Sequence, residues 1–261
     1  PGLGRLNCQF RNRCRRGCPF GAYFSSNSST LPAAEATGNM TLRTNSIVYE
    51  VIYDELNKRA TGVKIIDSES NLTYEFKAKI IFMCASTVPT TSILMQSKSN
   101  RFPNGLGNDS GELGHNIMDH HFQIGADATY DGFEDKYYTG RRPNGIYIPR
   151  FQNIGGKTKN TNFLRGYGYQ GGASRTDWTK YVKEASYGEK LKQAVIRPGE
   201  WTMGLNGFGE VLPYHDNKIF LDYNKTDKWG LPTVTFDAKL RENELNMRKD
   251  MQLQAMEMLD N

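Results

Sequence analysis

Three cysteines near the start of the sequence have the residue type and spacing of potential metal ligands. Cys8, Cys14 and Cys18 lie within eleven residues, and Pro19 follows the last of them. Clustered thiolates are the ligands of zinc and of iron–sulfur centres, and Cys-x3-Cys-Pro is similar to iron–sulfur ligand runs. The spacing is not that of a zinc ribbon, because no second Cys or His pair follows at the distance that such a site needs. Reduced structural cysteines and one disulfide are the alternative interpretations.

A second group of potential ligands lies between residues 115 and 121. His115, Asp119, His120 and His121 place three imidazoles and one carboxylate within seven residues. Such side chains can bind a transition metal, but no regular helix or strand spacing brings these four together. The spacing of these four residues therefore does not favour a metal site.

A turn of small residues at 85–87 could have a different role, namely the binding of an anionic cofactor. It follows the apolar run 80–85, whose lack of alternation predicts a strand that is covered on both faces. Pro89 is tolerated in a first helical turn, so a short helix is expected to follow and to end near Gln96. A strand, a small turn and a helix N-terminus together present backbone N–H groups that can bind an anionic cofactor.

Alternating, β-branched segments predict the elements that position this turn. Residues 40–85 are expected to form a β-meander with strands at 41–44, 47–53, 62–67 and 74–78. A short capped helix is expected before it, at 30–36.

The second half of the sequence predicts an antiparallel sheet with helices on one face. Strands are expected at 122–128, 145–149, 163–169, 201–209, 218–222 and 233–236. Helices are expected at 178–194 and 241–259. The inward residues of the second helix are expected to be Leu245, Met251, Leu253, Met256 and Leu259. The fold class is therefore α+β, divided into segments 1–121 and 122–261.

Composition narrows the function classes. The chain has 261 residues, 38% of them hydrophobic, and a net charge of +5. No apolar run approaches the ~18 residues of a membrane span. Much of the positive charge lies in an arginine cluster before residue 17: Arg5, Arg11, Arg13, Arg15 and Arg16. Without a recognised nucleic-acid fold, such a cluster favours a solvated face, and no nucleic-acid partner is expected.

Five motifs, taken in order, carry a family resemblance. They are Gly-Cys-Pro-Phe-Gly-Ala-Tyr at 17–23, Cys-Ala-Ser-Thr at 84–87, Gly-Glu-Leu-Gly-His-Asn-Ile-Met-Asp-His at 111–120, Gly-Tyr-Gly-Tyr-Gln-Gly-Gly at 166–172 and Asp-Lys-Trp-Gly-Leu-Pro at 227–232. As a set, they resemble the glucose–methanol–choline (GMC) family of FAD-dependent oxidoreductases. Within that family, the sequence is similar to the flavoprotein subunits of gluconate, glucose and fructose dehydrogenases. The resemblance runs over nearly the whole chain.

The resemblance implies a cofactor, two domains and site residues. Segment 1–121 would be part of an FAD-binding domain, and segment 122–261 an antiparallel-sheet substrate domain. Val48 would meet the adenine of FAD through its backbone, and Asp119 and His120 would make structural hydrogen bonds near the flavin. The full set of implied FAD-binding residues is Val48, Cys84, Ala85, Ser86, Asn116, Asp119 and His120. An iron–sulfur cluster would be held by Cys8, Cys14 and Cys18, although Gln9 replaces a further cysteine of the relatives.

The resemblance also implies an activity, the oxidation of an alcohol group of a sugar or sugar acid. Electrons would leave to a cytochrome or quinone, in the periplasm or cytoplasm of a bacterium. The family's Gly-x-Gly-x-x-Gly fingerprint and catalytic histidine match no residue of this sequence. We therefore assign no catalytic residue and expect the chain alone to be inactive and to hold FAD poorly. The alternative is a non-catalytic carbohydrate-binding module, whose candidate contacts are Tyr167, Tyr169, Gln170, Trp201 and Asn206.

Overall fold

The computed structural model describes residues 4–10, 14, 17–133, 135, 145–175, 187–196 and 199–261, which form two compact units. The first unit holds Pro1–Thr41, Asp119–Val211 and Leu240–Asn261, and the second holds Leu42–Met118 and Leu212–Lys239. The chain therefore passes between the units four times, whereas the sequence predicts one division after residue 121. The assignment of an FAD-binding and a substrate domain to 1–121 and 122–261 stays a prediction.

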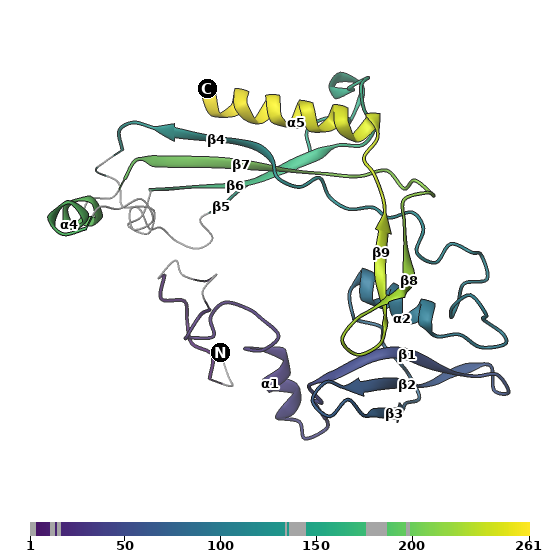
Figure 1. The fold of residues 1–261 in the computed structure, drawn as a ribbon. Helices are drawn as coiled ribbons and strands as arrows, with labels where there is room; N and C mark the ends of the chain where they lie inside the picture. Colours follow the sequence, from purple (N-terminus) through teal and green to yellow (C-terminus); the bar gives the residue numbers. More distant parts are fainter. Residues whose placement is uncertain are drawn as a thin grey trace. The chain divides into compact units, whose positions relative to one another are not determined.

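The second unit contains the predicted β-meander. Its three antiparallel strands, in the order β1-β2-β3, are Ser46–Asp54, Arg59–Asp67 and Thr73–Lys77. Helix α2 (Thr87–Gln96) packs against β1 and β8, and a hairpin of β8 (Lys218–Thr226) and β9 (Pro232–Asp237) completes the unit (Figure 1). The buried side chains of Val51, Ile65 and Ile93 form the small core of this unit.

The first unit is built on a four-stranded antiparallel sheet. Its strands, in the order β4-β7-β6-β5, are Ile124–Tyr130, Trp201–Gly209, Tyr167–Arg175 and Gly145–Ile148. The long helix α5 (Glu242–Asp260) lies along one face of this sheet and contacts β4 and β7 (Figure 1). Tyr167, Tyr169 and Leu205 of the sheet form the core with Met247 and Met251 of the helix. This arrangement confirms the predicted α+β class with an antiparallel sheet and a helix on one face.

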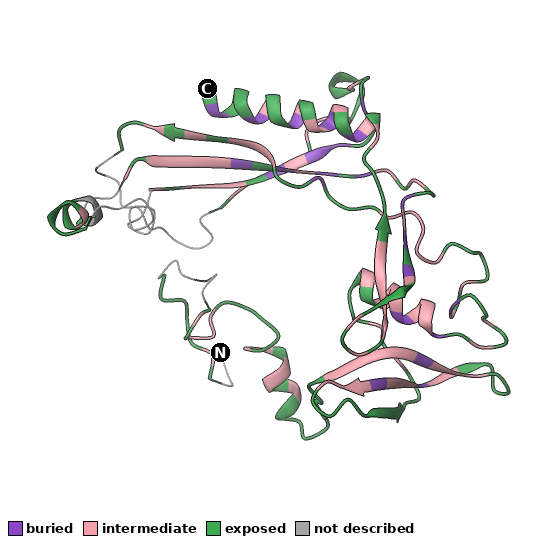
Figure 2. Ribbon diagram, in the orientation of Figure 1, coloured by how far each residue is buried: buried purple, intermediate pink, exposed green. Residues whose placement is uncertain are grey.

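The buried face of helix α5 matches the predicted one only in part, because Met251 and Leu259 are buried as expected. Its buried residues recur every three or four positions: Glu244, Met247, Met251, Ala255 and Leu259. Leu245, Leu253 and Met256 are expected inside but are 49%, 64% and 47% exposed. The pattern of buried and exposed turns along α5 is visible in Figure 2. Met247 and Met251 are inside because Gly207 and Gly209 of β7 leave room for their thioethers.

Three shorter helical segments complete the described chain: α1 (Thr30–Glu35), η2 (Gly156–Thr158) and α4 (Glu189–Ile196). The first confirms the helix predicted at 30–36. Helix α4 matches the end of the helix predicted at 178–194, most of which lies outside the described residues. None of the helices described here is long and apolar enough to cross a bilayer.

The strand predicted at 80–85 is wrong. These residues form no strand, and the side chains of Ile80 and Phe82 are 71% and 83% exposed. A buried strand of this type needs neighbouring strands to pair with it. In the described part of the chain no segment pairs with 80–85, so the apolar run stays uncovered. The strand predicted at 41–44 is absent too, and β1 begins at Ser46.

Candidate functional site

The turn before α2 has an open helix N-terminus. Cys84, Ala85 and Ser86 are exposed, and Ser86 precedes the helix with φ 70° and ψ 167°. This backbone conformation is one that glycine adopts far more readily than serine. The Ser86 side chain makes no capping hydrogen bond, while its carbonyl oxygen accepts the N–H of Thr90 at 3.0 Å. The N–H groups of the first turn are therefore directed outward, as anion binding requires.

Val48 lies on β1, which is an edge strand of the meander. It pairs with Ile65 of β2, and a β-bulge follows between Val48 and Glu50. An edge strand leaves half of its backbone groups unused by the sheet. Further along β1, the N–H of Val51 donates to the Ser97 hydroxyl at the end of α2 at 2.8 Å. The strand with Val48 and the helix after Ser86 are therefore fixed to each other within the second unit.

Asn116 also belongs to the second unit, in a loop with a pair of histidines. Its Nδ2 donates to the Glu112 carboxylate at 2.7 Å, and its φ is 59°. The rings of His115 and His215 stack with centroids 4.1 Å apart, and Nε2 of His215 lies 3.3 Å from Glu112. The N–H of Ile117 donates to the Asn217 carbonyl at 2.9 Å. These contacts hold the loop of Asn116 against residues 215–217.

Asp119 and His120 belong to the first unit, where both are exposed. The Asp119 carboxylate accepts the backbone N–H of His120 at 2.7 Å, which is a local structural hydrogen bond. His120 forms a β-bridge with Glu210, and the edge of its ring meets Phe208 with centroids 6.2 Å apart. His120 is thus attached to the end of β7.

The next residue, His121, has a role that the sequence does not indicate. Its side chain is 1% exposed, its Nε2 lies 3.2 Å from the Glu210 carbonyl oxygen, and its N–H donates to the Gly209 carbonyl at 3.0 Å. Among the described residues, no group hydrogen-bonds to its Nδ1. Burial lowers the pKa of His121, so the neutral imidazole is favoured. No sequence feature distinguishes this buried histidine from its exposed neighbour.

The sheet of the first unit presents a row of polar and aromatic side chains on the face opposite α5. Gln170 of β6 pairs with Tyr147 of β5 and with Asn206 of β7, and all three are exposed. Directly paired residues on one face have Cβ atoms ~5 Å apart. Phe208 follows Asn206 by two residues and shares its face, so the His120 ring lies beside this row.

The two tyrosines of β6 that are proposed to face a sugar do not do so. Tyr167 and Tyr169 point into the core beneath α5 and are 2% and 0% exposed. The Tyr169 hydroxyl donates to the Met251 carbonyl at 2.6 Å. Trp201 lines a separate apolar cavity of about 370 Å³ with Tyr130 and other side chains. The strand alternation places Tyr169 and Gln170 on opposite faces, which the sequence alone does not orient.

The N-terminal cysteines are not gathered into a metal site. All four cysteines are free, with Cys8 exposed and Cys14 and Cys18 partly exposed. Within the described ranges, no group of three His, Cys, Asp or Glu side chains could hold a metal ion. The predicted iron–sulfur ligation is therefore unsupported, and so is the disulfide alternative. Arg5 donates to the Gly21 carbonyl at 2.9 Å and to the Ser29 hydroxyl at 3.0 Å, whereas the other arginines of the cluster lie outside the described residues.

Residues 6–122 match the family model of the GMC oxidoreductases. Over this segment, the chain is similar to the GMC oxidoreductases. It is 28% identical over 236 residues to 2-methyl-1,2-propanediol dehydrogenase of Mycolicibacterium austroafricanum, covering 88% of this chain and 41% of that protein. It is 25% identical over 237 residues to the fructose dehydrogenase large subunit of Gluconobacter japonicus, covering 90% of this chain and 42% of that protein. The chain thus spans about two fifths of the length of these curated relatives.

Proposed function

We propose that the protein to which this chain belongs is an FAD-dependent dehydrogenase that oxidises an alcohol group of a sugar, sugar acid or other small polyol. The match of residues 6–122 to the GMC oxidoreductase family carries this proposal. The similarity to a diol dehydrogenase and to a fructose dehydrogenase subunit supports an alcohol carbon as the site of reaction. The names of these two relatives give different substrates, so the substrate class that we propose is a hydroxylated compound.

Two features of the second unit fit FAD. The open N-terminus of α2 suits an anionic group such as a pyrophosphate, and it follows Ser86, whose φ is positive. The edge position of β1 suits a backbone contact from Val48. We propose that Val48, the turn Cys84–Ser86 and Asn116 hold the cofactor, with Asp119 and His120 supporting its binding. When bound, FAD would supply the acceptor for the two electrons that leave the alcohol as hydride.

The row of side chains on the open face of the sheet fits a polyol substrate. A hydroxyl both donates and accepts hydrogen bonds, and the carboxamides of Gln170 and Asn206 can satisfy both roles. Tyr147 and Phe208 add aromatic surface for the apolar face of a sugar ring. The alcohol must lose a hydride from carbon and a proton from oxygen to become a carbonyl. We assign that proton to a base outside this chain, because none of its four histidines matches the family's catalytic position.

The electron acceptor is inferred separately from the reaction class. The cysteine group predicts a cytochrome or quinone acceptor, but the three thiols do not form a metal site among the described residues. The name of the fructose dehydrogenase large subunit indicates that this relative works with other subunits. We propose a protein or quinone acceptor on that basis alone and assign no relay through the cysteines.

The test is an anaerobic titration of the protein from its complete gene. We expect flavin absorption bands in the purified protein and their loss when a polyol substrate is added. A survey of fructose, gluconate, glucose and 2-methyl-1,2-propanediol would identify the substrate class. A folded, complete protein without flavin would refute the proposal. If flavin is present but none of the four compounds reduces it, the proposed cofactor is supported and the proposed substrate class is refuted.

A further inference from the structure

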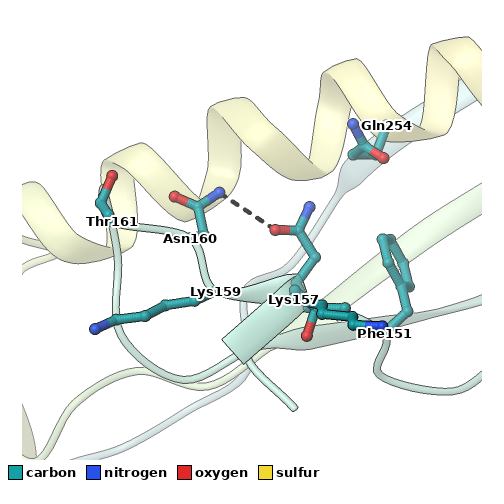
Figure 3. Close-up of a pocket in the computed structure, with 8 residues that line it drawn as sticks. Phe151, Lys157, Lys159, Asn160, Thr161 and Gln254 are labelled. Carbon is teal, nitrogen blue, oxygen red and sulfur yellow. Dashed lines mark hydrogen bonds between the residues drawn. The ribbon is translucent and has the colours of Figure 1, made fainter. Parts of the chain in front are cut away.

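A polar cavity of about 470 Å³ lies in the first unit, between the loop 151–161 and helix α5. Figure 3 shows that Lys157 extends toward Phe151, that Lys159 points in the opposite direction, and that Gln254 approaches from the helix. None of the residues that line it belongs to the candidate cofactor turn or to the row on the open face of the sheet. Its volume is in the range of small-molecule sites, about 300–1,000 Å³.

The loop that carries the lysines is held by a network of hydrogen bonds. Asn153 donates from Nδ2 to the carbonyl oxygens of Phe163 at 3.2 Å and Arg165 at 2.6 Å. Its Oδ1 accepts the N–H of Asn160 at 2.7 Å, and its own N–H donates to the Thr158 carbonyl at 2.8 Å. The shape of the loop is therefore set before any ligand arrives, which reduces the entropy lost on binding.

The floor of the cavity is fixed to α5 by a second network. Gln152 donates from Nε2 to the Asp250 carboxylate at 2.8 Å and accepts at Oε1 from Asn160 at 3.2 Å. The Tyr167 hydroxyl also donates to Asp250. Burial and this carboxylate hold the pKa of Tyr167 well above its usual value, so the phenol keeps its proton. The Asp250 carboxylate is thus occupied by two donors from the protein.

Among the remaining polar groups that line the cavity, hydrogen-bond donors outnumber acceptors. No acidic side chain is among the described residues that line it. Neither Lys157 nor Lys159 has a carboxylate within ion-pair distance in the part of the chain that the structure describes. Two ammonium groups with three donors each, beside amides whose acceptors are partly used, favour a ligand that brings negative charge and acceptor oxygens. Phe151 offers an apolar wall at the end toward which Lys157 extends.

We propose that this cavity binds a small hydroxylated anion, namely a sugar bearing a carboxylate or a phosphate. The oxyanion would contact the ammonium group of Lys157, which extends toward Phe151, and Lys159 would add positive charge nearby. The hydroxyls would bond to the amides of Asn160 and Gln254, and the ring would lie on Phe151. Because the loop and α5 form this site on the side of the sheet opposite Gln170 and Asn206, it stands apart from the proposed site of oxidation.

Calorimetric titration of the complete protein with gluconate, glucose 6-phosphate and glucose tests this site. The diagnostic variant is Lys157→Gln/Lys159→Gln. The matched control is Lys190→Gln/Lys192→Gln, which removes the same charge from exposed positions of α4. We expect the first variant to weaken one anion-binding event at least tenfold. The control should leave that event unchanged, and Lys157→Arg/Lys159→Arg should retain it.

The anion that binds distinguishes a carboxylate from a phosphate ligand, and either result supports the site. The proposal is overturned when neither anion binds, or when both glutamine variants bind it as the parent protein does. Reduction of the flavin by an alcohol is measured separately and should be the same in all variants. If the protein contains no flavin, the proposed oxidation is refuted, but the anion-binding measurement still tests the cavity.

Discussion

Burial of His121 links the stability of the first unit to pH. The imidazole is neutral in the folded chain because its pKa is lowered by burial, whereas in the unfolded chain it would titrate near its usual value, about 6.5. As the pH falls, the unfolded chain therefore protonates His121 at a higher pH than the folded chain does. The stability that neutral His121 contributes is complete above pH ~6.5 and is lost progressively as the pH falls from there toward the lower pKa of the folded chain.

Replacing His121 by Gln should weaken this pH dependence. Gln can still donate to the Glu210 carbonyl but cannot take up a proton. We expect the difference in free energy of unfolding between pH 7.5 and pH 5 to be smaller in His121→Gln than in the parent chain, measured by urea denaturation at both values. The exposed neighbour supplies the control, His120→Gln, which should keep the parent's difference. Equal pH dependence in all three proteins would exclude His121 as the source.

The carboxamides on the open face should affect substrate binding and leave the fold intact. In the complete protein, Gln170→Ala or Asn206→Ala removes hydrogen bonds to substrate hydroxyls, each worth about 0.5–1.5 kcal/mol. We expect KM for the polyol to rise about 2- to 10-fold, with the flavin content unchanged. Gln193→Ala, on the exposed surface of α4, is the control. An unchanged KM in both strand variants would show that the substrate does not bind on this face of the sheet.

At the scale of elements, close strand packing explains which glycines cannot be replaced. A Cβ at Gly125 of β4 would overlap the carbonyl oxygen of Leu205, which is backbone and cannot rotate away. A Cβ at Gly145 of β5 would have its nearest neighbour, the Gly171 carbonyl oxygen, at 3.4 Å. We expect Gly125→Ala to lower the free energy of unfolding by about 2 kcal/mol or more, and Gly145→Ala by well under 1 kcal/mol. Chemical denaturation of the two variants would check this difference.

The face of α5 gives a second test at this scale. Met251 is 0% exposed against β7, whereas Leu253 is 64% exposed on the same helix. We expect Met251→Ala to cost about 2–5 kcal/mol of stability, because it leaves a cavity beside Gly207 and Gly209. Leu253→Ala should cost less than about 0.5 kcal/mol. Equal losses in the two denaturation midpoints would contradict the observed orientation of the helix.

The same helix shows how far the sequence determines the fold. The sequence predicts the strand at 201–209 and the three strands of the meander closely, because alternation and turn residues are local signals. It also predicts strands at 41–44 and 80–85 that do not form. It predicts the buried face of α5 only in part, since apolar residues occur on several sides of this helix. Which side packs inward depends on Gly207 and Gly209, about forty residues earlier in the chain. A local pattern cannot supply that partner, and for the same reason it cannot reveal His121 or orient Tyr169 away from a sugar.

At the scale of the whole molecule, cofactor binding should depend on residues beyond this chain. The chain spans 41% and 42% of its two relatives, and the glycine fingerprint and catalytic histidine of the family match no residue in it. We expect the 261-residue chain to retain far less than one FAD per molecule after gel filtration, and the complete protein to retain about one. Flavin absorbance relative to protein gives the ratio. Stoichiometric FAD, or turnover by the chain alone, would contradict this prediction.

The four passages of the chain between the two units have a consequence for how the protein can be made and dissected. A ribosome delivers residues in order, so the β8–β9 hairpin of the second unit emerges only after all four strands of the first unit's sheet. The second unit is complete only when that hairpin has been made, and the sheet receives helix α5 only after the hairpin. A single proteolytic cut could not release either unit intact, and neither could be transplanted into a relative as one continuous gene segment. Exchange of either unit between homologous chains would therefore require interleaved grafts.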